Sequence, residues 1–183
     1  MNHQMETTEE KPLINKIAQS GLITIDLEKF YPTEEWVEID LADYLFKGLI
    51  LKEKEFREKV KNSPWEEMHG KILRVFCSTD AIIPPWAYMM ISKHALPGAR
   101  YIGYGDREAI LSAVIKENLE QNLKEEQYSD KRILVKGCST KQIPRDVYFS
   151  ITELLLPHCK SLMYGEACSN VPIYKQSVKR SRN

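Results

Sequence analysis

Short apolar runs alternate with longer amphipathic stretches over the second two-thirds of the chain. The runs are short enough to be buried strands and cover residues 71–76, 100–104, 132–137 and 161–165. Between them, apolar residues recur every three or four positions, as in a helix, over residues 84–96, 106–127 and 144–156. This alternation predicts an α/β protein with an open parallel sheet of about four strands, covered by helices.

Residues 12–66 precede this pattern and are more irregular. An amphipathic stretch that ends at Gly21 predicts a short helix, LITIDL predicts a strand, and LKEKEFREKVK predicts a helix that Ser63-Pro64 ends. Asp40 is placed to cap the helical turn that follows it. We therefore expect an N-terminal helical and partly extended subdomain, and we divide the chain into a disordered tail (1–11), this subdomain (12–66), the α/β domain (67–174) and a basic tail (175–183).

One segment of the α/β domain is repeated in the sequence. ILRVFCSTDAIIP at residues 72–84 matches ILVKGCSTKQIP at residues 133–144. With one gap, the match extends over residues 72–105 and 133–165 with 13 identities in 33 positions. The identities include two prolines and the final glycine as well as apolar residues. The sequence therefore predicts a duplicated βαβ unit whose two copies are joined by the helix at 106–127.

The duplication leads to a predicted strand order. With the four strands numbered one to four along the chain, right-handed crossovers that reverse between the two copies give the order 2-1-3-4. Strands one and three are then central neighbours, so Cys77 and Cys138, which follow them, meet at the carboxyl edge of the sheet. Open α/β sheets bind ligands in this crevice, and helices begin beside it.

Three of the four cysteines are expected at this edge. Cys168 closely follows strand four, whereas Cys159 precedes that strand and therefore lies about 17 Å away at the opposite edge. We interpret Cys159 as a small buried hydrophobic residue. Cys77, Cys138 and Cys168, which converge from three loops, predict a metal-thiolate site for zinc or for iron as an iron–sulfur cluster. The chain has no Cys-x-x-Cys spacing, so this prediction depends on the strand order.

Further residues complete the predicted metal site. Asp80 is the first choice for a fourth ligand, because its counterpart in the repeat is Lys141 and this difference needs a reason. Glu166, a water or a bound small molecule are the alternatives. Ser78, Ser139 and Lys141 are expected to stabilise a thiolate or a bound anion, together with the nearby helix N-termini.

Composition and charge narrow the expected partners. Lys plus Arg and Asp plus Glu both number 26, so the chain has no net charge to attract nucleic acid or an anionic membrane. No apolar run approaches the roughly 20 residues that span a bilayer, and the N-terminus lacks a signal pattern. We therefore expect a cytoplasmic protein without nucleic-acid or membrane partners. In a reducing compartment, its four cysteines favour free thiols or metal ligands over disulfides.

Several stretches together resemble one known family. SGLITIDLEKFYP, LFKGLILKEKEFREK, CSTDAIIPPWAYM, VKGCS and MYGEACSNVPIYK are similar to the bacterial family catalogued as domain of unknown function 2480, over roughly residues 12–175. That family has no established activity, so the resemblance implies no reaction. It implies a bacterial cytoplasmic protein. Through the family's association with iron–sulfur assembly genes, the resemblance also favours iron over zinc as the metal and implies iron–sulfur assembly proteins as partners. Cys77, Cys138 and Cys168 match the family's three Cys-Ser motifs.

Two other functions stand beside metal binding. In the first, the protein is a thiol enzyme in which a helix N-terminus activates one cysteine as the nucleophile. Asp80 acts as acid or base, and a second cysteine is the resolving thiol. In the second, it is a scaffold or assembly partner without chemistry. A Cys–His nucleophilic pair is not expected, because His69, His94 and His158 are all predicted at the edge opposite the cysteines.

Overall fold

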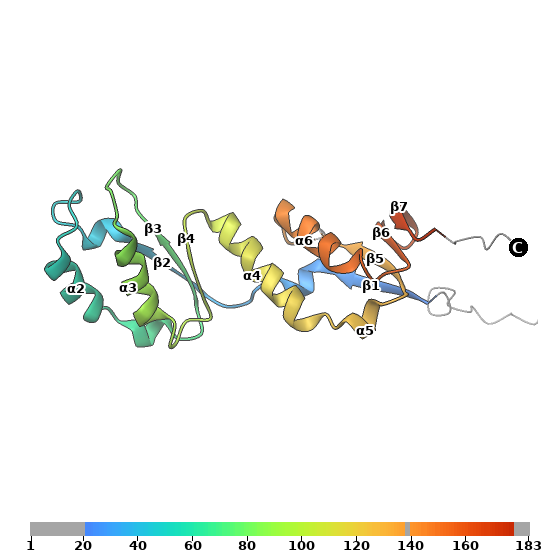
Figure 1. Cartoon of the computed structure of the whole chain (residues 1–183), viewed down its shortest axis with the longest axis horizontal. Helices are drawn as coiled ribbons and strands as arrows, with labels where there is room; N and C mark the ends of the chain where they lie inside the picture. The colour runs from blue at the N-terminus through green and yellow to red at the C-terminus, as the bar shows by residue number, and fades with distance from the viewer. Residues whose placement is uncertain (1–20, 138–139, 178–183) are drawn as a thin grey trace, which may run out of the picture. The chain divides into compact units, whose positions relative to one another are not determined.

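The computed structural model describes residues 21–137 and 140–177, which form a mixed α/β structure with two open sheets (Figure 1). Its strands are β1 (Leu22–Asp26), β2 (Trp36–Asp40), β3 (Ile72–Phe76), β4 (Tyr101–Tyr104), β5 (Arg132–Lys136), β6 (Ser161–Glu166) and β7 (Ser169–Lys175). Its α-helices are α2 (Glu53–Lys61), α3 (Pro85–Ala95), α4 (Arg107–Asn122), α5 (Glu125–Tyr128) and α6 (Arg145–Leu155). Three short 3-10 helices are η1 (Leu27–Phe30), η2 (Leu41–Tyr44) and η3 (Trp65–Met68).

The chain forms two compact units, each built from separate stretches of sequence. The described residues of one unit are 21–25, 125–136 and 155–177, and they contain a four-stranded sheet and α5. The other unit contains residues 26–124, 137 and 140–154, with a three-stranded sheet, α2, α3, α4 and nearly all of α6.

The three-stranded sheet has the order β2-β3-β4, and both strand pairs are parallel. Successive side chains of the central strand β3 point to opposite faces. On one face, Leu73 and Val75 are buried in a core that includes residues of α2 and α3. On the other face, Ile72 is buried against Ile110 and Val114 of α4. Apolar side chains on both faces explain why four of the five residues of β3 are apolar, with Arg74 as the exception.

Gly103 on β4 allows α4 to approach this sheet closely. A Cβ at Gly103 would lie 2.8 Å from Cγ1 of Ile110 and 3.3 Å from the ring of Tyr101. A larger residue would therefore push α4 away from the sheet, and with it the first turn of that helix.

The four-stranded sheet has the order β1-β5-β6-β7, in which β5 and β6 are parallel and β6 and β7 form an antiparallel hairpin. The sequence did not predict β7. Pro172 within it argues against a strand, and almost every residue of β7 is exposed, so the strand lacks a clear apolar pattern. The strand forms at the end of the sheet, where proline is tolerated, and the pairing is irregular between Leu162 and Met163.

The predicted strand order 2-1-3-4 is wrong. The predicted strands one and three are β3 and β5. They were expected to be central neighbours, but they lie in different sheets. The reason is that the N-terminal region supplies a strand to each sheet: β2 pairs with β3 and β1 pairs with β5. Residues 12–66 thus contribute directly to both sheets, while the coarser prediction of an open, mostly parallel α/β structure is confirmed.

The segments β3-α3-β4 and β5-α6-β6 correspond element by element. The backbone N–H of Arg100, before β4, donates to the carbonyl of Lys71 at 2.9 Å. At the matching place before β6, the N–H of Lys160 donates to the carbonyl of Lys131, also at 2.9 Å. In both segments the strand, the proline before the helix and the return strand occur in the positions that the sequence match predicts.

Most of the predicted helix boundaries are confirmed. Asp40 caps η2 by accepting a hydrogen bond from Ala42 N, and Asp106 caps α4 by accepting from Glu108 N and Ala109 N. The helix predicted over 106–127 is divided, because Leu123 has extended backbone dihedrals between α4 and α5. The helix that was expected to end at Gly21 lies outside the described residues.

Candidate functional site

The carboxyl edge of the three-stranded sheet brings several polar residues together. Because β2, β3 and β4 are parallel, the chain leaves all three strands at this edge, after Asp40, Phe76 and Tyr104. The central strand β3 leads into the loop Cys77-Ser78-Thr79-Asp80, between the ends of its two neighbours. Ligands of open α/β sheets bind at such an edge.

Asp40 fixes the loop that follows β3. One oxygen of its carboxylate, Oδ1, accepts hydrogen bonds from Ala42 N at 2.9 Å and from Ser78 N at 3.0 Å. Burial acts to raise the pKa of Asp40, but hydrogen bonds from the Ser78 side chain and from both backbone N–H groups outweigh it. The pKa of Asp40 is therefore lowered, and the ionised carboxylate holds the loop base at neutral pH.

Cys77 lies half-buried at the start of this loop, against the core of α2 and α3. Its Sγ is 3.4 Å from Oγ1 of Thr79. The ring of Tyr88, on α3, packs edge-on against Tyr104 with their centroids 4.9 Å apart. Burial, a hydrogen bond with Tyr104 and the charges of the ionised Tyr104 and Cys77 raise the pKa of Tyr88 to about 12. Tyr88 is therefore a neutral phenol beside the thiol.

A cleft of about 340 Å³ lies where α4 begins, directly after β4. One wall is the first turn of α4, and the other comes from Tyr31 and from the segment before α6. Its lining residues are Tyr31, Asp106, Arg107, Glu108, Leu111, Gln142 and Pro144. Its volume falls within the range of small-molecule sites.

Glu28 in η1 holds the wall that precedes α6. Its Oε1 accepts from Thr140 N at 2.8 Å and from Lys141 N at 3.3 Å, and its Oε2 accepts from Thr140 Oγ1 at 2.8 Å. The ammonium of Lys141 lies over the ring of Tyr31, 4.8 Å from its centroid. These contacts fix the segment that carries Gln142 into the cleft.

The opposite wall is fixed by charges at the start of α4. The guanidinium of Arg107 lies 4.3 Å from the ring centroid of Trp36 and 3.5 Å from Oε1 of Glu38. By contrast, the side chains of Glu108 and Gln142 form no hydrogen bond or ion pair with any other described residue. Both are exposed, so both are available to a ligand in the cleft.

The predicted metal ligands among the described residues come from two different sheets. Cys77 and Asp80 follow β3 in the three-stranded sheet, whereas Cys168 is exposed in the turn between β6 and β7 of the other sheet. Cys138 lies outside the described residues, as does Ser139. The reasoning that placed Cys77 beside Cys138 is wrong, because it required β3 and β5 to be neighbours. Within residues 21–137 and 140–177, no group of three or more His, Cys, Asp or Glu is placed to hold a metal ion.

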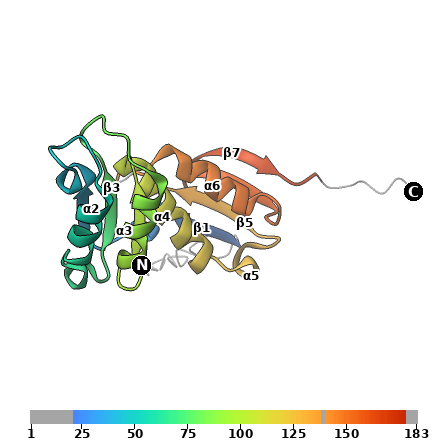
Figure 2. The same cartoon turned by 60° about the vertical axis from the view of Figure 1, so that its left-hand side comes forward.

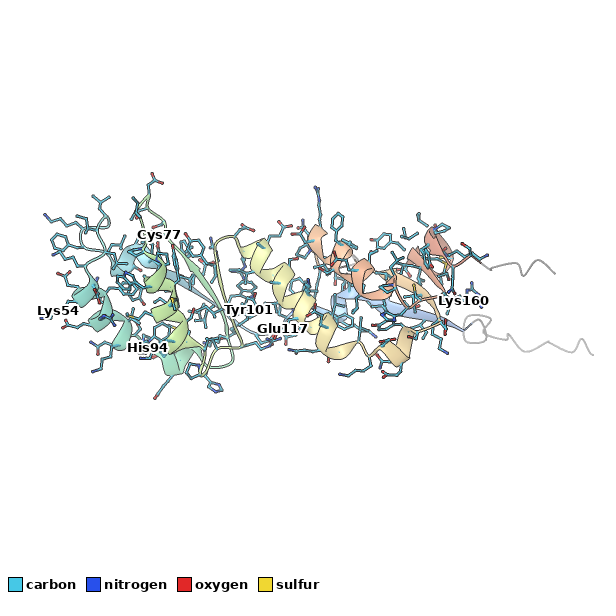
Figure 3. All side chains as sticks on the ribbon, viewed as in Figure 1. Lys54, Cys77, His94, Tyr101, Glu117 and Lys160 are labelled. Atoms are coloured by element: carbon cyan, nitrogen blue, oxygen red, sulfur yellow. The ribbon has the colours of Figure 1, made fainter. Side chains whose placement is uncertain are left out.

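The interpretation of Cys159 is confirmed. Its side chain is only 3% exposed, and burial raises the pKa of its thiol. The predicted position of His94 is also confirmed: it lies in the last turn of α3, at the opposite end of this helix from Cys77, and stacks on Trp65 (Figure 3). His158 follows α6, and its Nδ1 is 2.9 Å from Oε1 of Glu125.

Of the residues that build the site, Ser78 and Lys141 were predicted, whereas Asp40 was predicted only as a cap. Ser78 is held through its backbone N–H, and Lys141 lies over an aromatic ring. The role of Glu28 and the cleft itself were missed. One signal could have revealed them: Ile-Asp-Leu occurs at residues 25–27 and again at 39–41, and each copy joins a strand to a 3-10 helix.

A comparison with known families identifies the class of this chain. The model of the family described as "Protein of unknown function (DUF2480)" matches residues 11–176. The chain therefore belongs to this family, as its motifs suggested. No curated protein and no solved structure matches it. In the described part of the chain, no helix is both long and apolar enough to cross a membrane.

Proposed function

We propose that this protein binds a small polar molecule in the cleft between the first turn of α4 and the segment before α6. The single observation that supports this is the cleft itself, which has ligand-like volume and lies at the carboxyl edge of a parallel sheet. Both walls are held in place, one by Glu28 and the other by Arg107 contacts. A cleft with fixed walls loses little entropy when it binds a ligand.

The cleft chemistry favours a ligand with amino or hydroxyl groups. The Arg107 guanidinium and the Lys141 ammonium are already engaged with Glu38 and aromatic rings. Two side chains of the cleft are available to a ligand: the Glu108 carboxylate accepts hydrogen bonds, and the Gln142 amide accepts and donates them. The Tyr31 phenol and Asp106 also line the cleft. Leu111 and Pro144 offer a small apolar surface to the carbon skeleton of the ligand.

A thermal-shift screen tests this function. Amines, amino sugars, polyols and matched carboxylic acids are added to the wild-type chain, and hits are measured by calorimetry. We expect a hit among the amines or polyols, and Glu108→Gln should weaken it at least about tenfold, since a hydrogen bond to a charged group is lost. Glu120→Gln on the same helix, about 18 Å further along, should bind normally. A hit that ignores Glu108, or no hit at all, contradicts the proposal.

Metal-thiolate binding is the second candidate function. One observation favours it: β5 and β6 are parallel neighbours, so the chain leaves both strands at the same edge of their sheet. Cys168 is exposed in the turn after β6, and Cys138 follows β5 in the sequence. Zinc, or iron as an iron–sulfur cluster, takes thiolate ligands of this kind.

Elemental analysis of protein purified without oxygen tests the second candidate. About one metal ion or cluster per chain should be present, and Cys138→Ser or Cys168→Ser should lose it. Cys159→Ala should keep it, because that thiol is buried. Loss of metal in Cys77→Ser as well would support the three-cysteine set predicted from the sequence. Wild-type protein that takes up neither zinc nor ferrous iron excludes this function.

We also infer that β3-α3-β4 and β5-α6-β6 are copies of one ancestral unit. The 13 sequence identities and the matching hydrogen bonds before β4 and β6 support this inference. For each copy, a strand that ends in Ile-Asp and is followed by Leu precedes the unit and pairs with its first strand.

A further inference from the structure

Exposed apolar side chains surround the carboxyl edge of the three-stranded sheet. They come from the loop after η2, the loop after β3, the end of β4 and the second turn of α3. Two of them are among the most exposed: Ile82 at 90% and Leu49 at 68%. The set is Phe46, Leu49, Ile50, Ile82, Met89 and Tyr104, and we refer to it as the apolar rim. Large exposed apolar side chains that gather at one edge of a fold mark an interaction site.

The tip of the rim at residues 46–50 has a defined conformation. Phe46 N donates to the Ile50 carbonyl at 2.8 Å, and Ile50 N donates to the Phe46 carbonyl at 3.2 Å. Lys47 and Gly48 between them take left-handed φ values of 48° and 70°. The hydrogen bonds satisfy the backbone of the turn, so its apolar side chains are presented to solvent by a formed structure and not by a loose loop.

The two loops of the rim extend beyond the same edge of the sheet. Their strands, β2 and β3, are parallel neighbours, and the Asp40–Ser78 hydrogen bond of 3.0 Å joins the bases of the loops. Both views of the chain show the loops on the same side of the sheet (Figure 1, Figure 2). The two loops are therefore presented at the same edge of the sheet.

The charges on this surface are complementary to one another. Lys47 lies at the tip of one loop and Asp80 lies in the other, and both are exposed. Neither forms an ion pair with any residue that the structure describes. A two-fold axis that passes between the loops, perpendicular to the sheet, would place Lys47 of one copy opposite Asp80 of a second copy.

We propose that the apolar rim is a homodimer interface in which two carboxyl edges meet, and that Lys47 and Asp80 pair between the copies. The interface is isologous, so each Lys47–Asp80 contact occurs twice. The apolar side chains provide the buried centre, and the two ion pairs select the register and disfavour other partners. Cys77 stands at the base of one loop, so dimerisation also limits access to its thiol.

Sedimentation equilibrium across a concentration series tests the proposal. The wild type should dimerise, and Leu49→Glu or Ile82→Glu should make it a monomer. Lys47→Glu and Asp80→Lys should each weaken the dimer at least about tenfold, because each places like charges opposite one another. The double variant Lys47→Glu/Asp80→Lys should restore it. Lys93→Glu, an exposed lysine near the other end of α3, should dimerise normally.

Restoration by the double variant separates a true contact from a folding defect, which a second charge change would not repair. The alkylation rate of Cys77, followed by peptide mapping, should rise in the monomeric variants. A wild type that is monomeric throughout the series overturns the proposal, as does a dimer that is insensitive to all four single variants. A monomer that binds anionic vesicles through the rim overturns it in favour of a lipid surface.

Discussion

The loops after β3 and β5 begin with the same residues, Cys-Ser-Thr, and in each loop a carboxylate from the N-terminal region binds one of these residues. Asp40, at the end of β2, binds the first loop through Ser78 N. Glu28, two residues beyond the end of β1, binds the second loop through both the N–H and the hydroxyl of Thr140. The two acids differ in their place: Asp40 is the N-cap of η2, whereas Glu28 lies within η1.

The consequence of this difference is a division of roles. The first loop continues through Asp80 and Ile82, which are exposed on the apolar rim. The second loop continues through Lys141 and Gln142, which turn towards Tyr31 and the cleft. Two loops that share their first three residues therefore differ in the residues that follow and in what those residues contact.

Truncation of the leucine after each strand-end aspartate should have the largest effect. Leu27 and Leu41 are both fully buried first residues of 3-10 helices. Leu27→Ala and Leu41→Ala should each lower the free energy of unfolding by about 2–5 kcal/mol, through lost burial and a residual cavity. Urea unfolding followed by circular dichroism and tryptophan fluorescence measures this. A loss below about 1 kcal/mol in one variant only would show that the two junctions are not equivalent.

Gly137, which occupies the position of Phe76 in the sequence repeat, tests the packing of the junction after β1. A Cβ at Gly137 would lie 2.8 Å from Cβ of Leu27. Gly137→Ala should therefore lower the free energy of unfolding by about 1–3 kcal/mol through overpacking. The double variant Gly137→Ala/Leu27→Ala should be little worse than Leu27→Ala alone, because the clash partner becomes smaller. Additive losses in this double-mutant cycle, measured by urea unfolding, would contradict the steric explanation.

The local structure could be predicted from the sequence because it depends on near neighbours. The strand β3, the helix α3 with Pro85 in its first turn and the Asp106 cap of α4 all follow from periodicity and capping residues. The pairing of strands could not be predicted in this way. The strand order was inferred from a rule for the connections between parallel strands. That rule does not predict that β1 pairs with β5 and that β2 pairs with β3.

The site shows the same limit. Asp40 was identifiable as a cap because capping is local, but its second hydrogen bond, to Ser78, joins residues far apart in sequence. Glu28 contacts Thr140, which is also far away in the sequence. Nothing in the sequence around Glu28 distinguishes it from an ordinary surface glutamate. Cys159 could be assigned correctly, because it lies at the opposite end of β6 from Cys168 and a free cysteine away from a ligand site is usually a small buried residue.

Acid titration distinguishes the Asp40 anchor from other carboxylates. The pKa of Asp40 is lowered in the folded state, so its contribution to stability is present above its ordinary value of 3.8 and is lost as the pH falls through the lowered value. Asp40→Asn should lower the free energy of unfolding at neutral pH by about 1 kcal/mol and reduce its dependence on acid pH. Urea midpoints between about pH 7 and pH 3 measure both effects. Asp43→Asn, an exposed control, should show the same pH dependence of stability as the wild type. If Asp40→Asn also shows the acid dependence of the wild type, Asp40 does not anchor the loop through its charge.

The smallest expected effect separates the two corresponding tyrosines. Tyr148 donates its hydroxyl to the Gly137 carbonyl at 2.9 Å, whereas Tyr88 packs against Tyr104 and its pKa is raised to about 12. Removing either hydroxyl, in Tyr88→Phe or Tyr148→Phe, should lower the free energy of unfolding by about 0.5–1.5 kcal/mol.

Alkaline titration should then distinguish these two variants. Because the neutral form of Tyr88 is favoured in the folded state, its contribution to stability is present below the ordinary pKa of 10.0 and is lost as the pH rises towards 12. Ultraviolet titration of the folded protein should show a late-ionising tyrosine that Tyr88→Phe removes and Tyr148→Phe retains. Burial and the charges of Glu125 and Glu126 also raise the pKa of Tyr128, so a late component should remain in both variants. An unchanged late component in Tyr88→Phe would show that the phenol beside Cys77 is not the shifted group, and the contrast between the two tyrosines would be lost.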